Sequence, residues 1–387
     1  MCGIFGFTSK QLSIDTKNIL KQMGRTLRHR GPDQSGSYIN DNFAMGIERL
    51  SILDAKNGNQ PIFSNNGNFV IMHNGEVYNY KELRNSLIEH GYKFRTKSDT
   101  EVILSGYKEH GFNFFKKMKG MWALAIIDKD KKELILSRDR FGEKPLYYHN
   151  NNDGFYFGSQ IRQIQILSNK KFKINDKQIF NYLCLGYRSL EKFNINFFKG
   201  IKKVNPGSIL KFNLNKIAQY KYWNLNYRPN QSIDYKLAIK EVRKKVIQAI
   251  ERNIVSDVPI SVLLSGGIDS NIILSVINKL FKKKISTFSI IDKDKKYNES
   301  ELIDASVKDN NVKNYKIILE QNKMSELIRE IKKSVNYNSK PLYTLTSLIS
   351  NKLHRIIKKK GIKVSLTGAG ADELFTGYYD HGLHYLC

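Results

Sequence analysis

Apolar runs in the first half of the chain are short and alternate with polar residues. Five segments show this pattern between turn residues: CGIFGF, NFAMGIERLSIL, NFVIMHNGEVYN, MWALAIIDKDKKELILSRD and PLYYHNNNDGFYFGS. Alternation with Asn, Gly and Asp at the turns is typical of antiparallel hairpins. Two stretches of helical spacing intervene, at about 15–30 and 80–92. The first half therefore predicts an α+β domain with layered antiparallel sheets and helices packed on them.

The pattern changes after residue 200. Pro206, Gly207 and Pro229 interrupt strands and helices, and we place an interdomain linker near the end of this stretch. A helix is predicted over about 234–254, and strands then alternate with helices through VPISVLL, NIILSVINKLF, KISTFSII, ESELIDASVKDNN, YKIILE and GIKVSL. This alternation predicts an α/β domain with a doubly wound parallel sheet. The expected parts are a first domain at 2–215, a linker at 216–233 and a second domain at 234–387.

Length and composition narrow the class of protein. A chain of 387 residues with 41% hydrophobic content has room for two domains. It contains no apolar run long enough to span a bilayer, and its start does not resemble a secretory signal. The three cysteines, Cys2, Cys184 and Cys387, are far apart and odd in number, which favours a reducing compartment over a disulfide framework. We therefore expect a soluble, cytoplasmic protein with no membrane partner.

The formal charge of +28 raises the alternative of a nucleic-acid-binding protein. The basic residues are mostly lysines in short scattered runs, and no basic stretch is interleaved with stacking aromatic residues. We therefore interpret the charge as solvated surface and expect no nucleic-acid partner. The alternative predicts strongly salt-dependent affinity for DNA or RNA.

A glycine loop follows the apolar strand at residues 262–264. Its sequence is SGGIDS, from Ser265 to Ser270, and a helix is predicted directly after it. Glycines allow the backbone to approach a ligand closely, and the free N–H groups of a helix start favour a phosphate. The GK[ST] sequence of a Walker A loop is absent, so backbone, hydroxyl groups and a metal would meet the ligand's charge. Asp269 would hold that metal, which is expected to be Mg²⁺.

A second loop of this kind stands near the other end of the chain. It runs from Thr367 to Gly370 after the predicted strand GIKVSL, and the acidic pair Asp372 and Glu373 follows it. Loops of this composition after a buried strand usually hold a phosphate or a metal. We expect the two loops to form two walls of one nucleotide site, with Asp372 facing Asp269.

Cys2 is a candidate nucleophile. With a small residue in second place, Met1 is normally removed, which leaves a cysteine at the terminus. Such a residue carries its own base, because the thiolate attacks while the α-amine, with an ordinary pKa of about 8, relays the proton. A buried, unreactive cysteine remains the alternative on this evidence alone.

Four segments behind Cys2 supply what a glutamine amide site needs: RHRGPD, RLSILD, HNGEVYN and SDTEVIL. Arg49 can bind an α-carboxylate in a bidentate pair, and Glu76 and Asp99 can pair with an α-ammonium. Asn74 and the N–H of Gly75 can donate hydrogen bonds to a tetrahedral oxyanion. Four such segments together make a coincidence improbable.

The chain resembles glutamine-hydrolysing asparagine synthetase of the bacterial B type, from residue 1 to about 380. The resemblance rests on these segments, on GMWALAIID and RDRFGEKPLYY, and on SGGIDS, which is similar to the loop of N-type ATP-pyrophosphatases. It implies an N-terminal-nucleophile (class II) glutamine amidotransferase domain followed by an ATP-pyrophosphatase domain. The implied glutamine site comprises Arg49, Leu50, Ser51, Ile52, Leu53, Asn74, Gly75, Glu76 and Asp99. The implied ATP site comprises Leu263, Ser265, Gly266, Gly267, Asp269, Ser270, Ile290, Thr367 and Gly368, with Asp269 and Asp372 as Mg²⁺ ligands.

The resemblance also implies a reaction. Cys2 would form a glutamyl thioester and release ammonia, with Asn74 and Gly75 as the oxyanion hole. ATP and Mg²⁺ would convert aspartate to β-aspartyl-AMP, and ammonia delivered through an internal tunnel would give asparagine, AMP and pyrophosphate. Separating the steps keeps the ammonia away from water. A homodimer is left open as the assembly.

The sequence departs from the family at the second loop. The family commonly has a glutamate, tied to β-aspartyl-AMP formation, where this chain has Ala369, and its GGY reads Thr376-Gly377-Tyr378. Family synthetase domains also continue beyond this motif, so we expect either a gene fragment or a second half that needs a partner. Two other functions stay open: amidation of a sugar acceptor in surface-polysaccharide synthesis, and a glutaminase with an inactive synthetase half.

Overall fold

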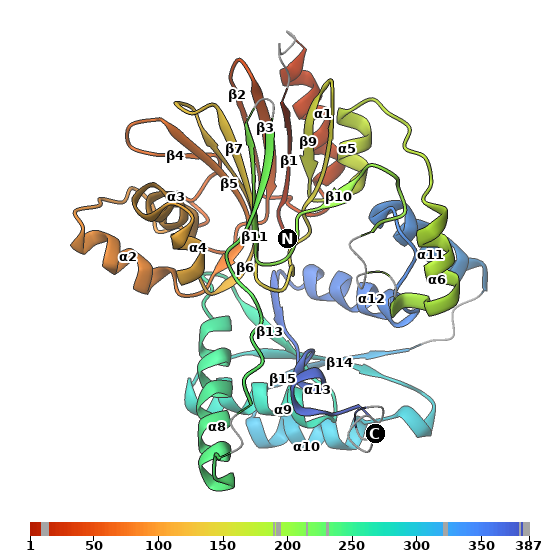
Figure 1. Ribbon diagram of the computed structural model, residues 1–387. Helices are drawn as coiled ribbons and strands as arrows, with labels where there is room; N and C mark the ends of the chain where they lie inside the picture. The colour runs from red at the N-terminus through yellow and green to blue at the C-terminus, as the bar shows by residue number, and fades with distance from the viewer. Residues whose placement is uncertain are drawn as a thin grey trace. The chain divides into compact units, whose positions relative to one another are not determined.

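The computed structural model describes residues 1–8, 15–188, 190, 195–213, 216–229, 232–319, 324–378 and 381; Cys387 lies outside them. The chain forms two compact units (Figure 1). The first comprises Met1–Arg228 with Glu330–Leu345, and the second comprises Pro229–Arg329 with Thr346–Cys387. Within the described residues, no helix combines the length and the apolar composition needed to cross a bilayer.

The first unit contains two six-stranded sheets that are antiparallel throughout. One has the order β10-β8-β9-β1-β3-β2 and the other β12-β11-β7-β6-β5-β4. The strands of the first sheet are β1 (Gly3–Thr8), β2 (Gln34–Ile39), β3 (Phe43–Arg49), β8 (Tyr147–Asn151), β9 (Gly154–Gly158) and β10 (Lys202–Lys203). Those of the second are β4 (Ile62–Phe63), β5 (Phe69–Val77), β6 (Gly120–Asp128), β7 (Glu133–Arg138), β11 (Ser208–Asn213) and β12 (Lys216–Lys221). The predicted hairpins are thus present.

The sheets face each other across one core and carry helices on their outer faces (Figure 1). Ile4 and Met45 of the first sheet pack with Met72 of the second between the sheets, whereas Phe5 and Ala44 turn to the outer face. This is the two-residue period that the alternating sequence predicts. The helices beside the first sheet are α1 (Thr16–Leu27) and α5 (Ile161–Leu167); those beside the second are α2 (Tyr80–Glu89), α3 (Asp99–His110) and α4 (Asn113–Lys117).

Helix α3 was not predicted from the sequence. Most of its residues are buried, including Asp99 and Glu101, so it shows no polar stripe that would reveal a helical period. Ser98 starts it as a side-chain cap, because its hydroxyl accepts a hydrogen bond from Thr100 N. The cap and the buried first turn hold Asp99 in a fixed position.

The boundary of the first unit also differs from the expected one. Residues 216–221, which the sequence analysis assigned to the linker, form strand β12 and pair antiparallel with β11. The segment KIAQYK shows little alternation of apolar and polar residues. Because most of its side chains are exposed, its composition is close to that of a linker. Glu330–Leu345 also belongs to this unit; there the backbone oxygen of Leu342 accepts a hydrogen bond from Tyr182 of α6 (Asp176–Leu185). Helix α11 (Met324–Asn338) spans the unit boundary.

The second unit is a four-stranded parallel sheet with the order β15-β14-β13-β16. Its strands are β13 (Ile260–Leu263), β14 (Ser286–Ile291), β15 (Lys313–Ile318) and β16 (Val364–Leu366). Helices α8 (Tyr235–Asn253), α9 (Ile268–Ser275) and α10 (Ser300–Asn310) share one apolar cluster with the sheet, and α12 (Thr346–Lys359) shares another. The doubly wound prediction is confirmed. Large apolar side chains also face solvent, among them Leu374, 78% exposed, on the short helix α13 (Ala371–Phe375).

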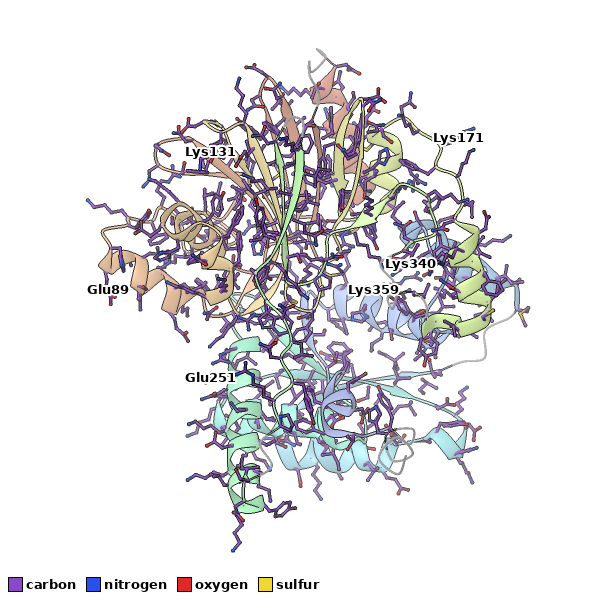
Figure 2. The ribbon with its side chains drawn as sticks, viewed as in Figure 1. Glu89, Lys131, Lys171, Glu251, Lys340 and Lys359 are labelled. Atoms are coloured by element: carbon purple, nitrogen blue, oxygen red, sulfur yellow. The ribbon has the colours of Figure 1, made fainter. Side chains whose placement is uncertain are left out.

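Exposed lysines occur on distant parts of the first unit. Figure 2 shows Lys131 and Lys171 at opposite edges of the first unit, in the loop between β6 and β7 and after α5. Both residues are exposed, as is Glu89 at the end of α2.

Candidate active site

Cys2 precedes β1 and is 8% exposed. Its Sγ accepts a hydrogen bond from Leu50 N at 3.3 Å and donates to Leu50 O at 3.6 Å. Burial raises the pKa of the thiol, while the terminal amine, the Leu50 N–H, Arg49 and Arg30 act in the opposite direction. The thiol is therefore neutral at rest, but the groups around it would stabilise a thiolate once a base removes the proton.

The amine of Met1 lies close to the same cations. Burial, followed by the charges of Arg30 and Lys144, lowers the pKa of the Met1 amine to about 6, although the charges of Cys2 and Glu76 oppose the shift. The amine donates a hydrogen bond to Arg30 O at 3.2 Å, and Arg30 Nε donates to Cys2 O at 2.9 Å. The Met1 amine is thus favoured in its neutral form, and a neutral amine can accept a proton from a thiol.

Asn74 lies near the end of β5 and is 1% exposed. Neither its Oδ1 nor its Nδ2 has a hydrogen-bond partner among the described residues. A buried amide without partners is rare, and its Nδ2 is available to donate to a ligand oxygen. Gly75 follows it where a side chain would collide with β6, because its Cβ would stand 2.1 Å from Met121 O.

Arg49 ends β3 and is buried. Its Nη2 donates hydrogen bonds to Leu53 O at 2.7 Å and Asp54 O at 3.2 Å, so the guanidinium orders the loop that also holds Cys2 Sγ. The charges of Cys2 and Asp99 both act on its pKa, which burial lowers. Arg49 therefore lies close to the nucleophile and to the acidic side of the site. The loop residues Leu50 and Ile52 are half-buried, and Ser51 and Leu53 are buried.

Two buried carboxyl groups form the acidic side of the site. Burial and the charge of Asp99 raise the pKa of Glu76 to about 7, and Lys144 opposes this shift. Asp99 Oδ2 accepts a hydrogen bond from Val77 N at 2.9 Å. His73 Nδ1 lies 3.9 Å from Asp99 Oδ2, but burial lowers the pKa of this histidine, so we interpret the contact as one with a neutral ring. An ammonium group from a ligand would relieve the repulsion between the two carboxylates.

Sequence reasoning missed two cations, Arg30 and Lys144. Lys144 is buried, and the charges of Glu76, Glu143 and Cys2 all act on it. The turn after β7 places it, because Asp139 Oδ2 accepts a hydrogen bond from Lys144 N at 3.0 Å. The segment RDRFGEKPLYY was noted only as a point of resemblance. A lysine between glutamate and proline looks like a surface residue, so only the packing reveals that it is buried.

Affinity for a ligand that carries an α-ammonium group, such as the glutamine expected from the sequence, should depend on the ionisation of Glu76. The carboxylate form pairs with an α-ammonium and the protonated form does not, so we expect the KM for glutamine to rise as the pH falls through about 7. The measurement is the pH profile of KM, with kcat recorded separately. Glu76→Gln should give a raised KM with no such step. If the step in KM persists in that variant, Glu76 is not the group that titrates.

The glycine loop of the second unit lies between β13 and α9. Ser270 Oγ accepts a hydrogen bond from Ser265 N at 3.1 Å, and Ser265 Oγ accepts one from Gly267 N at 3.2 Å. Asn271 Nδ2 donates to Ser265 O at 3.1 Å and to Gly267 O at 2.7 Å. The loop is thus a compact hydroxyl-lined turn at the start of a helix, as the sequence predicts.

The second loop lies directly beside the first. Strands β13 and β16 are parallel neighbours, with Val262 opposite Leu366, so both loops leave the same edge of the sheet. A Cβ at Gly368 would stand 2.7 Å from the Cβ of Asp269, so only glycine permits this approach. Leu263 and Ile290, on the adjacent strands β13 and β14, pack against one apolar cluster. Thr367 and Ala369 are exposed.

The donors available for a metal are few. Asp269 is half-buried at the start of α9, and Asp372 is half-buried in the first turn of α13. Among the described residues, no group of three or more His, Cys, Asp and Glu side chains could enclose an ion. Two carboxylates on neighbouring loops suit Mg²⁺, which commonly takes one or two carboxylates and completes its shell with phosphates and water.

Comparison with known proteins accounts for both units. A model of the glutamine amidotransferase domain matches residues 1–223, and a model of asparagine synthase matches residues 241–385. A protein of Methanocaldococcus jannaschii named "Putative asparagine synthetase [glutamine-hydrolyzing] 2" is 32% identical to this chain. The match covers 98% of this chain and 76% of that protein. This chain belongs to the asparagine synthetase family. Asparagine synthetase 1 of Bacillus subtilis is 34% identical over 98% of this chain, which spans 59% of that protein.

The chain matches only part of the length of some relatives, and the relatives do not all have the same name. Amidase chry2 of Gibberella zeae is 29% identical over 98% of this chain and 59% of its own length. Relatives with different names thus share both matched regions of this chain. This chain spans about three fifths of the Bacillus and Gibberella relatives.

Proposed function

We propose that this chain hydrolyses glutamine at Cys2 and that its second unit uses ATP to activate a carboxylate for amidation, with aspartate as the acceptor and asparagine, AMP and pyrophosphate as products. The observation that supports the glutaminase part is the buried Asn74 amide without a partner, two residues before the buried Glu76 on β5, in a unit that also buries Cys2, Arg49 and Asp99. These are the groups that a glutamine amide and its transition state require.

In the proposed glutaminase step, Arg49 binds the α-carboxylate of glutamine, and Glu76 and Asp99 bind its α-ammonium. The α-amine, exposed as that of Cys2 when Met1 is removed, accepts the thiol proton as Sγ attacks the amide carbon. Asn74 Nδ2 and the Gly75 N–H stabilise the oxyanion. Collapse expels ammonia, which takes a proton from the amine, and leaves a thioester that water hydrolyses to glutamate.

In the proposed synthetase step, the SGGIDS loop and Thr367-Gly368 hold the phosphates of ATP, and Leu263 and Ile290 lie toward the adenine. Asp269 and Asp372 would hold Mg²⁺, which offsets the negative charge of the phosphates when bound. The support is the adjacency of the two loops at one sheet edge, where ligands of parallel sheets bind.

One observation favours a second candidate acceptor. Ala369 is exposed in the second loop, its N–H donates to Thr367 Oγ1 at 3.2 Å, and its methyl side chain offers no acid, base or charge to the acceptor. A nucleotide-linked sugar carboxylate is therefore the second candidate, with ammonia from the same glutaminase site.

The test is AMP and pyrophosphate release from ATP with ammonium and either aspartate or a UDP-linked uronic acid. We expect aspartate to stimulate release, and Asp269→Asn to reduce it by about 10²-fold or more while glutamine hydrolysis is unchanged. Stimulation by the sugar alone would replace aspartate with the second candidate. No release with either acceptor would leave a glutaminase with an inactive second unit.

A further inference from the structure

Three backbone donors of the SGGIDS loop, the N–H groups of Ser265, Gly266 and Gly267, are bonded to side chains of the protein. Ser265 and Gly267 donate to hydroxyl groups of the loop itself, those of Ser270 and Ser265. The N–H of Gly266 donates instead to Glu299 Oε2 at 2.9 Å. Glu299 is the one acceptor of the three that carries a charge, and it comes from outside the loop.

Glu299 belongs to a segment that packs against the loop. It is exposed and stands immediately before α10. A Cβ built on Gly266 would stand 3.1 Å from the Cβ of Glu299 and 3.0 Å from Leu302 Cδ1, so the glycine backbone and the start of α10 are in direct contact. The contact brings the acidic side chain to a donor at the positive end of α9.

A carboxylate oxygen and a phosphate oxygen compete for such a donor. Both are anionic acceptors that bind a backbone N–H at similar distances, and the single hydrogen of Gly266 N cannot serve both well. A phosphate that approaches this N–H meets the negative charge of Glu299 as well as the donor that Glu299 occupies. The affinity of the loop for phosphate therefore includes the work of displacing this side chain.

We propose that Glu299 is a specificity-determining residue of the ATP site. Its carboxylate accepts the hydrogen bond of the Gly266 N–H in place of a phosphate oxygen, and it is displaced when a pyrophosphate group binds. The proposal rests on the proposed nucleotide function of the loop. Displacement also breaks the hydrogen bond that ties the loop to the residue before α10, so nucleotide binding and the order of the first turn of Ser300–Asn310 are coupled. Glu299 thereby weakens binding of any anion that does not make further contacts, such as inorganic phosphate.

The test compares Glu299→Gln and Glu299→Ala with the native chain in calorimetric titrations with magnesium pyrophosphate. Both substitutions remove the competing charge, and we expect the Kd for pyrophosphate to fall about tenfold in each. The matched control is Glu301→Gln, in the same turn of α10, which should leave the Kd unchanged. Hydrogen exchange supplies a second readout, because pyrophosphate should reduce amide protection in the first turn of α10 in the native chain and not in Glu299→Ala.

A loop-bracing role predicts the opposite result. The side chain of Glu299→Gln could still accept the hydrogen bond from Gly266 N, whereas that of Glu299→Ala could not. A loop-bracing role therefore gives an unchanged Kd for pyrophosphate in Glu299→Gln and a raised Kd in Glu299→Ala. Either an unchanged or a raised Kd in both variants overturns the proposal. If none of the four proteins binds pyrophosphate, the nucleotide function of the loop fails, and the role of Glu299 fails with it. If the native chain binds pyrophosphate and neither Glu299 variant binds it more tightly, only the proposed role of Glu299 is wrong.

Discussion

Cys2→Ala should abolish glutamine hydrolysis, with a fall in kcat of at least about 10³-fold. The thiol is the only nucleophile that the proposed mechanism uses, and it is held in a buried position by hydrogen bonds with Leu50. The measurement is glutamate release from glutamine, together with mass spectrometry of the intact chain to establish that Met1 is removed.

The control for this variant is the other described cysteine, which is exposed on α6. Cys184→Ala should hydrolyse glutamine at the native rate. Ammonium-dependent AMP release should survive in Cys2→Ala, because that reaction bypasses the thiol. Undiminished glutamate release by Cys2→Ala would remove Cys2 from the mechanism.

Asn74→Ala should lower kcat for glutamine hydrolysis by about 10²–10³-fold with little change in KM, because an oxyanion donor acts in the transition state and not in the bound substrate. The same substitution should barely change the free energy of unfolding, by about 1 kcal/mol or less, since it removes a buried amide that has no partner. Steady-state kinetics and urea denaturation of one preparation measure both quantities.

The matched control is Asn79, which is buried to a similar degree but fully paired. Its Nδ2 donates to Lys117 O at 3.1 Å, and its Oδ1 accepts from Lys119 N at 2.8 Å. Asn79→Ala leaves these backbone groups unpaired and should cost about 1–3 kcal/mol of stability. If Asn74→Ala is the more destabilising and keeps its kcat, the amide is structural and the oxyanion role is wrong.

The pattern of the sequence predicted the sheets better than the helices of the first unit. Strands β1, β3 and β5 are visible in the sequence as short apolar runs bounded by turn residues, although helices cover their outer faces and β3 is buried along its whole length. The Asn-Asp-Gly turn between β8 and β9 adds a local signal. Helix α3 was missed because burial on most sides erases the period, and β12 was missed because an exposed edge strand looks like a linker.

The candidate sites divide in the same way. Arg49, Asn74, Glu76 and Asp99 were proposed as site residues from the sequence because each stands in a short segment whose chemistry is informative by itself. Lys144 was not proposed as a site residue, because only its burial among charged groups distinguishes it, and the sequence does not show that burial. The spacing of residues in the folded chain decides which acidic groups share a site. It therefore also decides that the pKa of Glu76 rises to about 7.

What the sequence by itself determined is the order of the two units and the antiparallel and parallel character of their sheets, since apolar runs and glycine turns are local properties. The nucleophile and the phosphate loops are predictions from the same local patterns. Only the tertiary structure decided which distant residues meet. Glu299 reaches Gly266 across 33 residues, and the Gly368 loop lies on Asp269, because parallel strands place loops that are far apart in sequence at one sheet edge. No local pattern encodes such contacts, since they arise from the packing of whole elements.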